Sequence, residues 1–210
     1  MEILFYVAAG LVAYLIGSFS TAVWLGKWFY DLDVRQHGSG NAGATNTLRV
    51  LGKRAGFVVL LIDVFKGWIV VFLAALIGEE LFMEKDLLLF KIVAAIAVVT
   101  GHIYPLYTRF KGGKGIATML GVIIGLFPGQ LILIEVGLFI IVFLVTRYVS
   151  LGSIVVALAL PVLSIWFYDV DIILKIVSVL VAVVVPVTHR TNIKRLYEGR
   201  ESKISFEEEK

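Results

Sequence analysis

Seven runs of apolar residues dominate the sequence and constrain its fold more than any other feature. They occupy residues 3–30, 55–78, 87–106, 116–127, 130–146, 149–167 and 171–187. Hydrophobic residues make up 60% of the 210-residue chain, whereas soluble domains average about 45–50% apolar residues. A helix of about 20 apolar residues crosses the hydrocarbon core of a bilayer. The sequence therefore predicts an all-α integral membrane protein with about seven transmembrane helices, and residues 1–210 as a single polytopic membrane domain.

Residues 115–146 are predicted to form two helices rather than one. A single helix over this range would be about 46 Å long at 1.5 Å per residue, which exceeds a hydrocarbon core of roughly 30 Å. Pro128 and Gly129 mark a turn between the two elements.

The first run follows an acidic residue, Glu2, and lacks a small-x-small cleavage site. We therefore expect it to be retained as a membrane span rather than removed as a signal peptide.

The distribution of charge predicts the orientation of the chain. With seven spans, fifteen of the nineteen Lys and Arg residues fall on one side, counting Lys27 at the end of the first run. Loops rich in Lys and Arg stay in the cytoplasm, and six spans would separate the basic C-terminal tail from the basic first loop. The pattern predicts an outside N-terminus and a cytoplasmic C-terminus. Its cytoplasmic functional segments would be about 31–54, 107–115, 147–153 and 188–203.

The first cytoplasmic segment carries the sequence GSGNAGATNTLR at residues 38–49. It contains G-x-G-x-x-G but follows a membrane helix rather than a strand, so a dinucleotide site is not expected. Its glycines free the backbone to present N–H groups, and its arginine is a bidentate donor for phosphate. The candidate anion-binding residues are Ser39, Gly40, Asn41, Gly43, Thr45, Asn46 and Arg49. The alternative is a flexible loop with a cytoplasmic arginine.

The second segment opens the short fourth span with Lys111, Gly112, Gly113, Lys114 and Gly115. It is not a Walker A loop, which needs a glycine five residues before the lysine and a Ser or Thr after it. Glycines and lysines at a helix N-terminus still combine backbone N–H groups, the positive end of the helix dipole and ammonium charges. A second anion site is expected here. A basic patch that touches anionic lipid is the alternative.

The third segment follows the last span and begins with His189. If it is helical, His189, Asn192 and either Arg195 or Leu196 share one face at spacings of three and four residues. The histidine could serve as a general base or as an anion ligand, whereas a basic helix on the membrane surface is the alternative. Arg147 and Ser150, at the turn before the sixth span, are candidates to complete an anion pocket, although an arginine there also fits simple topology.

Two charged residues lie inside the second span, Asp63 and Lys66. Because unpaired charges in a membrane are expensive, a mutual ion pair that faces the bundle interior is expected. The pair could be structural or catalytic, and the structural role is favoured. The sequence leaves open the roles of His102 and Glu135.

Several classes of chemistry are excluded or disfavoured. The chain has no cysteine and three histidines, and it shows no metal-ligand spacing on the basic face, so neither a metal nor a cofactor is expected. It has no Gly-x-Ser-x-Gly elbow. It also lacks the His-x4-Asp signature, because the corresponding positions after the three histidines are Ala42, Tyr107 and Lys194.

The three segments together resemble the bacterial acyl-phosphate glycerol-3-phosphate acyltransferase family, usually called PlsY. The resemblance covers essentially the whole chain in length, span count and motif order. The first motif matches residues 39–46 with Arg49, the second matches 101–102 and 111–115, and the third matches 189–196. Residues 63–67 and 147–153 also fit the family pattern, and no motif position departs from it.

The resemblance implies transfer of a fatty acyl group from acyl phosphate to the 1-hydroxyl of sn-glycerol 3-phosphate, without acyl-CoA. The products would be lysophosphatidic acid and phosphate, in the first step of phospholipid biosynthesis. It implies catalytic roles for Ser39, Arg49, His189 and Asn192. It also implies a multi-pass protein of the bacterial inner membrane whose active site faces the cytoplasm.

Other functions stay open on the sequence alone. A transporter or channel for an organic phosphate would use the same anion-binding residues without chemistry, although no internal repeat is evident. A CDP-alcohol phosphotransferase would need spaced aspartates that are missing here, and an inert scaffold would give the glycine-rich loops no purpose. Beyond its two substrates and the bilayer, we expect no nucleic-acid partner and no obligate protein partner.

Overall fold

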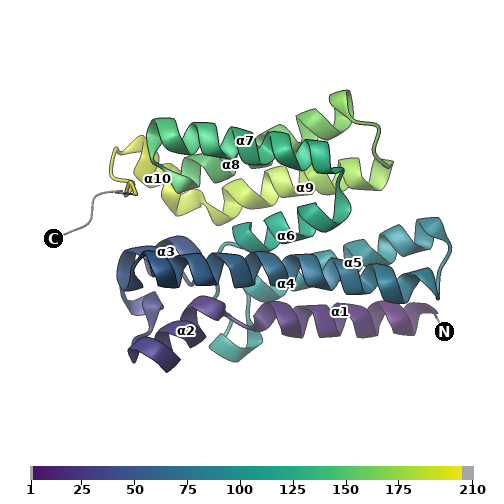
Figure 1. Ribbon diagram of the computed structural model, residues 1–210, viewed down its shortest axis with the longest axis horizontal. Helices are drawn as coiled ribbons and strands as arrows, with labels where there is room; N and C mark the ends of the chain where they lie inside the picture. Colours follow the sequence, from purple (N-terminus) through teal and green to yellow (C-terminus); the bar gives the residue numbers. More distant parts are fainter. Residues whose placement is uncertain (1, 205–210) are drawn as a thin grey trace. The chain divides into compact units, whose positions relative to one another are not determined.

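The computed structural model describes residues 2–204, and within that range the secondary structure is helical with no strand (Figure 1). The helices form two compact units, Met1–Leu126 and Phe127–Lys210. The expected all-α membrane architecture is confirmed. The single-domain assignment and the orientation of the termini stay predictions.

The first unit contains the helices α1 to α6. Their bounds are α1 Glu2–Ser18, α2 Thr21–Tyr30, α3 Ala44–Leu51, α4 Lys53–Glu79, α5 Glu84–Ile103 and α6 Ile116–Leu126. Short 3-10 turns lie at Val34–Gln36 and Leu106–Thr108. Helix α5 packs against α1 and α4, and α4 also packs against α6 (Figure 1).

The second unit contains the helices α7 to α10. Their bounds are α7 Gly129–Thr146, α8 Val149–Val162, α9 Ile172–Thr188 and α10 Arg190–Tyr197, with a π-helical turn at Leu163–Phe167. Helix α8 packs against both α7 and α9. The separation of α6 from α7 at Pro128 confirms the prediction of two elements in residues 115–146.

Within residues 2–204, five helical segments are long and apolar enough to cross a membrane. They are Glu2–Tyr30, Lys53–Glu79, Asp86–Thr108, Gly129–Thr146 and Val149–Phe167. Helices α9 and α10, which meet at a bend of 62°, would make a sixth. Helix α6 has 11 residues, or about 16 Å at 1.5 Å per residue, which is about half the hydrocarbon core. The count of seven spans therefore stays a prediction.

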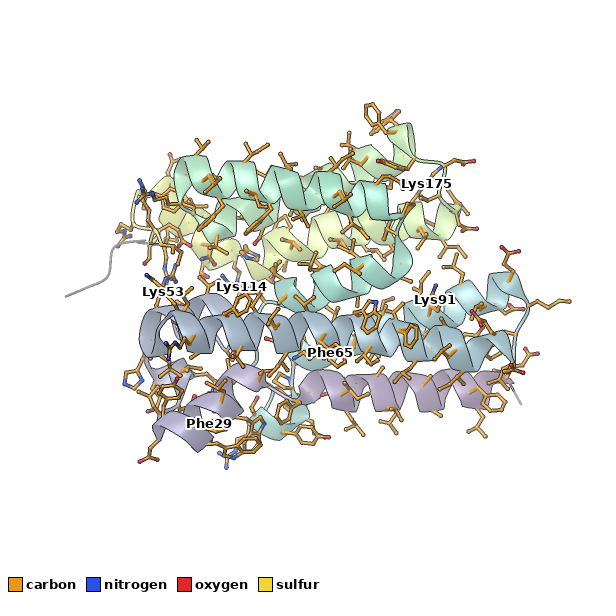
Figure 2. The ribbon with its side chains drawn as sticks, in the orientation of Figure 1. Phe29, Lys53, Phe65, Lys91, Lys114 and Lys175 are labelled. Carbon is orange, nitrogen blue, oxygen red and sulfur yellow. The ribbon has the colours of Figure 1, made fainter. Side chains whose placement is uncertain are left out.

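Large apolar side chains cover the outer surfaces of these helices (Figure 2). Phe65 on α4 is 55% exposed and Phe29 on α2 is 77% exposed. In water such surfaces would be unfavourable, whereas lipid is as apolar as they are. In unit 1, Lys53 and Lys91 lie toward opposite ends of the helices (Figure 2), which is consistent with an apolar band between two polar ends.

The first predicted span is interrupted at Phe19 and Ser20, which separate α1 from α2. The ion pair predicted inside the second span is found at this break. Lys66 Nζ lies 2.7 Å from Asp63 Oδ1 and donates to the Phe19 carbonyl at 3.1 Å. The Thr21 hydroxyl, in the first turn of α2, donates to Asp63 at 2.8 Å. The cation thus meets the end of one helix and the anion the start of the next, which complements both helix dipoles.

Glycines allow close approach of two helix pairs in unit 1. A Cβ at Gly67 of α4 would clash with the α6 backbone, and one at Gly121 of α6 would clash with the α4 backbone. Gly17 of α1 and Gly101 of α5 form an equivalent reciprocal pair. Small residues at membrane helix interfaces let backbones approach and pack by van der Waals contact. These contacts hold α6, and hence the loop that precedes it, against α4.

We predict that Gly121→Ala destabilises the protein by about 1–3 kcal/mol, because the added methyl group overpacks the interface of α4 and α6. Gly137→Ala in α7 is the matched control, since a Cβ there meets nothing within 4 Å. Thermal unfolding in detergent should show a lower midpoint for the first variant only. Equal midpoints for the two variants would contradict the close packing.

The predicted orientation is testable because the natural chain has no cysteine. Arg54 and Glu80 are exposed and lie at opposite ends of α4. We predict that a membrane-impermeant maleimide added to intact cells labels Glu80→Cys, and labels Arg54→Cys only after permeabilisation. The reverse pattern would refute the assigned orientation.

Candidate functional site

Asn46 organises the loop that carries Ser39. Its Oδ1 accepts hydrogen bonds from the Ser39 amide at 2.8 Å and the Ser39 hydroxyl at 3.1 Å. Its Nδ2 donates to the carbonyls of Val34 at 2.8 Å and His37 at 3.1 Å. The side chain is 1% exposed. Its two donated bonds use both N–H groups of the amide, and its two accepted bonds occupy the amide oxygen. Asn46, predicted to bind substrate, is therefore placed as a support for Ser39.

The glycines of this loop serve the same geometry. Gly38 and Gly40 have φ of 59° and 74°, in the left-handed region that glycine occupies without strain. A Cβ at Gly38 would also clash with the Asn46 side chain. The backbone can therefore fold tightly around Asn46 and leave Ser39 half-buried at the loop surface.

The rest of the first motif lies on or beside α3. Gly43 is the N-cap of this helix, and its carbonyl accepts hydrogen bonds from the amides of Asn46 and Thr47. Thr45 is in the first turn and Arg49 is in the last turn. Asn41, Thr45 and Arg49 are all half-buried.

The second loop is held against the end of α5. The Gly113 amide donates to the His102 carbonyl at 3.2 Å. A Cβ at Gly113 would clash with the His102 ring, and one at Gly112 would clash with the His102 carbonyl. These two glycines are thus required for close packing on His102. Gly115 has φ of 86° and its carbonyl accepts the Met119 amide at the start of α6.

His102 connects this loop to the buried ion pair. Its Nδ1 lies 3.1 Å from the Thr118 hydroxyl and 3.7 Å from Asp63 Oδ1. The ring is 5% exposed. His102, whose role the sequence left open, therefore joins α5, α6 and α4 behind the second loop. Lys111 is exposed and Lys114 is half-buried.

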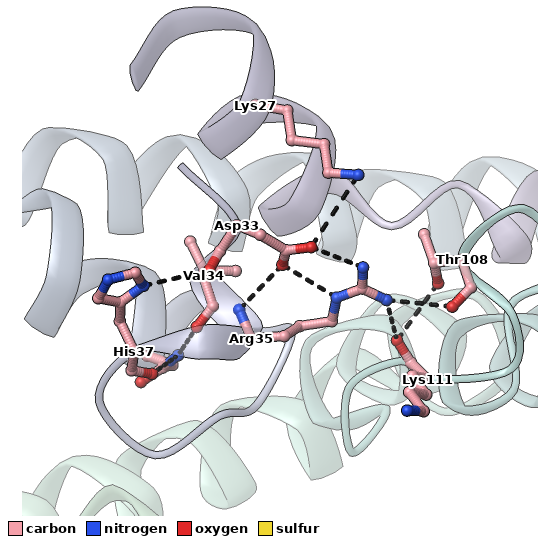
Figure 3. A network of polar contacts seen from close by, with 8 residues as sticks. Lys27, Asp33, Val34, Arg35, His37, Thr108 and Lys111 are labelled. Carbon is pink, nitrogen blue, oxygen red and sulfur yellow. Dashed lines mark hydrogen bonds and ion pairs between the residues drawn. The ribbon is translucent and has the colours of Figure 1, made fainter. Parts of the chain in front are cut away.

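The first and second loops meet within unit 1. The Ala42 carbonyl lies 2.9 Å from the position of a Cβ at Gly113. Arg35 makes the side-chain link: its Nη1 donates to the carbonyls of Thr108 at 3.0 Å and Lys111 at 3.4 Å (Figure 3). The two segments predicted to bind anions are thus neighbours, although Ala42 and Gly113 are 71 positions apart in the sequence.

Asp33 holds the guanidinium of Arg35 in place. Its two carboxylate oxygens accept from Nε at 3.0 Å and from Nη2 at 2.7 Å (Figure 3). The hydrogen bond from Arg35 is the main reason that the pKa of the Asp33 carboxyl lies below its usual range. The same bond raises the pKa of Arg35. Both groups therefore stay charged at neutral pH.

A cavity of about 590 Å³ adjoins the two loops. Five of the residues that line it are charged: Lys27, Asp33, Arg35, Arg109 and Lys111. Trp24 and Tyr107 contribute aromatic surface, and Gly40 and Gly112 contribute backbone. The volume is in the range of small-molecule sites, about 300–1,000 Å³, and the excess of cations suits an anion.

In unit 2, the third segment is helical: it forms α10, and His189 precedes it. His189 Nδ1 lies 2.9 Å from the Val185 carbonyl. A carbonyl can only accept, so Nδ1 carries the proton and Nε2 of the neutral ring carries the lone pair. The side chain is 3% exposed. The backbone thus fixes the tautomer that a general base at Nε2 requires.

Glu201 brings together two of the predicted residues in unit 2. Its Oε1 accepts from Asn192 Nδ2 at 2.6 Å and from the Ser150 hydroxyl at 2.7 Å. All three side chains are buried. Arg147 is exposed in a left-handed conformation at the end of α7, and its carbonyl accepts the Ile204 amide. Arg195 is exposed on α10, one turn beyond Asn192.

Sequence reasoning missed three residues of these arrangements: Asp33, Arg35 and Glu201. Asp33 and Arg35 lie two residues apart directly after a membrane span, and this spacing of opposite charges was a usable signal. Glu201 is an acidic residue in a basic tail. Its partner Ser150 is 51 residues away, so only the fold reveals the contact. Among residues 2–204, no group of three or more His, Cys, Asp or Glu is placed to hold a metal ion.

Comparison with known proteins identifies relatives along almost the whole chain. A family model described as glycerol-3-phosphate acyltransferase matches residues 7–199. A curated glycerol-3-phosphate acyltransferase from Staphylococcus carnosus is 43% identical over 203 residues, covering 93% of this chain and 96% of the relative. The corresponding protein from Staphylococcus saprophyticus is 44% identical over 200 residues, with the same coverage of both chains.

Two solved structures share the fold. The glycerol 3-phosphate form of PlsY (YgiH), an integral membrane glycerol 3-phosphate acyltransferase, has a TM-score of 0.83 and 33% identity, covering 95% of this chain and 96% of that one. Its lysophosphatidic acid form has a TM-score of 0.80 and 32% identity, covering 95% of each chain. The chain therefore belongs to the PlsY family of integral membrane glycerol-3-phosphate acyltransferases.

Proposed function

We propose that the protein transfers a fatty acyl group from acyl phosphate to the 1-hydroxyl of sn-glycerol 3-phosphate. The products are lysophosphatidic acid and phosphate, and the reaction takes place at the cytoplasmic face of the bacterial inner membrane. Two observations on relatives support the acceptor and the product, because PlsY was solved in a glycerol 3-phosphate form and in a lysophosphatidic acid form. The same reaction begins phospholipid biosynthesis.

The observation that carries the proposal is the meeting of two glycine-rich loops beside a cation-lined cavity in unit 1. Both substrates carry phosphate, and the loops offer backbone N–H groups and cations at one place. The surrounding helices expose apolar side chains, which suits a substrate with a fatty acyl chain. An anion site beside a bilayer is thus the expected arrangement for joining a phosphorylated alcohol to a lipid chain.

Acyl phosphate is a mixed anhydride, so its phosphate is a good leaving group. The acceptor hydroxyl oxygen forms a bond to the acyl carbon, and the bond from that carbon to the phosphate oxygen breaks. Positioning and charge stabilisation can supply most of the rate without a covalent enzyme intermediate. Ser39, Thr45, Arg49 and the N–H groups of the first loop hold phosphate. Rotation of the Ser39 hydroxyl exchanges its bond to Asn46 for one to a phosphate oxygen.

The proton of the acceptor hydroxyl has two candidate destinations. One is His189 Nε2, because the hydrogen bond of Nδ1 to Val185 leaves the lone pair on Nε2. The other is a phosphate oxygen of the substrate. Asn192, which Glu201 orients, would help to hold the acceptor in either case. Both routes balance, since free phosphate carries away the proton or receives it later from the histidine.

The remaining predicted residues bind the phosphates of the two substrates in this proposal. The loop of the second motif holds either glycerol phosphate or the acyl phosphate head, through its lysines and N–H groups. Arg147, Ser150 and Arg195 are also proposed to bind substrate phosphate. The proposed binding residues of the second motif are Lys111, Gly112, Gly113, Lys114 and Gly115.

We predict that the purified protein in lipid, given palmitoyl phosphate and glycerol 3-phosphate without metal or CoA, releases phosphate and lysophosphatidic acid in equal amounts. Ser39→Ala should abolish both products, because the reaction loses a hydroxyl that holds phosphate. Unchanged thermal unfolding of the variant is the control for folding. Hydrolysis without lipid product would refute the acceptor assignment, and phosphate uptake into vesicles without product would favour a transporter.

We predict that Gly113→Ala lowers turnover by about 100-fold, since a displacement of about 1 Å at a reaction site can cost that much. The added methyl group must push the loop away from His102 and Ala42. Gly137→Ala, which meets nothing within 4 Å, serves as the matched control. Turnover within twofold of the control would show that the loop does not contact the reacting groups.

A further inference from the structure

We propose that Asp33 and Arg35 form a positioning pair that fixes the loop of the second motif relative to the loop that carries Ser39. The pair lies outside the three sequence motifs and was not among the predicted site residues. This inference rests on the proposed function, because it assigns the pair a role in the same reaction.

The contacts of Arg35 span the two loops. Asp33 and Arg35 belong to the segment that begins the first loop, and Asn46 anchors the same segment by bonding the Val34 carbonyl. The guanidinium reaches across to the Thr108 and Lys111 carbonyls. One side chain therefore ties a segment that is rigid through Asn46 to the backbone directly before Gly112 and Gly113.

The loop that Arg35 reaches has a backbone that needs such support. Arg109 and Phe110 have φ of 57° and 59°, and consecutive non-glycine residues in the left-handed region are strained. Such conformations persist only where surrounding contacts impose them. The Thr108 hydroxyl also donates to the Lys111 carbonyl at 3.2 Å, so this carbonyl is held from both sides of the turn.

The guanidinium is already committed to protein atoms. Four of its N–H groups donate: Nε and Nη2 to Asp33, and Nη1 to two carbonyls, out of five on an arginine. Arg35 thus positions the loop rather than binding substrate phosphate. A lysine cannot replace it, because a single ammonium group lacks the planar fork that spans a carboxylate and two carbonyls.

Asp33 supplies the matching negative charge. The cavity beside the pair is also lined by Lys27, Arg109 and Lys111, and Lys27 Nζ lies 4.0 Å from Asp33 Oδ2. Without the carboxylate, Arg35 would face other cations and would lose the two hydrogen bonds of its bidentate pair with Asp33. Asp33→Asn should therefore weaken the link even though the side chain keeps its shape.

The test compares kcat and KM of Arg35→Ala, Arg35→Lys and Asp33→Asn with those of the unmodified protein, using palmitoyl phosphate and glycerol 3-phosphate. Arg54→Ala is the control, since Arg54 is an exposed arginine in the first turn of α4. We expect kcat/KM to fall by about 100-fold in Arg35→Ala, the scale of a 1 Å misplacement. The lysine variant should recover little, and the control should stay within twofold.

Chemical rescue separates a positioning role from a general loss of structure. Added methylguanidinium should restore at least a tenth of the lost activity to Arg35→Ala by occupying the space between Asp33 and the two carbonyls. It should restore none to Ser39→Ala. Activity of Arg35→Ala and Asp33→Asn within twofold of the unmodified protein would overturn the proposal. Failure of methylguanidinium to rescue Arg35→Ala in a sample with normal thermal unfolding would also overturn it.

Hydrogen exchange without substrate tests the link independently of turnover. In Arg35→Ala and Asp33→Asn, the backbone amides of residues 107–115 should exchange faster than in the unmodified protein. The exchange rates in α4 should stay unchanged. Unchanged exchange in residues 107–115 would overturn the link even if the protein proves to be an acyltransferase. If the unmodified protein is inactive but these residues lose protection, the proposed reaction is wrong and the link stands.

Discussion

The buried ion pair of Asp63 and Lys66 is the interaction on which unit 1 depends. A membrane offers no water to polar groups, so charges and interrupted backbone must find partners inside the protein. Here the charges and the interrupted backbone are partners of each other. At the break between α1 and α2, Lys66 donates to the Phe19 carbonyl, and the Thr21 hydroxyl donates to Asp63. The break in turn directs α2 toward α3, α4 and the turn that begins the first loop.

The second motif shows that glycines in a phosphate-binding pattern can serve packing first. Gly112 and Gly113 lie where a methyl group would meet His102, and His102 contacts Thr118 and approaches Asp63. Gly67 and Gly121 bring α4 and α6 close enough for these contacts. The loop therefore rests on a continuous polar arrangement that starts at the ion pair. Its position depends on buried contacts at least as much as on the lysines that flank it.

The apolar helices, the turn at Pro128 and the buried ion pair were predictable because their signals are local: hydropathy, proline and charge spacing. The break at Phe19 and Ser20 was not, since neither residue is a helix breaker and the partners of the break lie on α4. Within the site, the hydrogen bonds by which Asn46 holds Ser39 were not predictable either, because the fold of the loop sets the partners of the amide. The role of Asn46 in substrate binding stays a prediction.

The structure divides residues of the same type into those that hold the loops and those that remain exposed at the surface. Arg35 is paired with Asp33, whereas Lys111 and Arg195 are exposed. The distinction has a consequence for pH. Because the pKa of Asp33 is lowered, its contribution is present above the ordinary aspartate pKa of about 3.9 and is lost only as the pH falls through the lowered value. The link between the loops therefore stays intact near neutral pH.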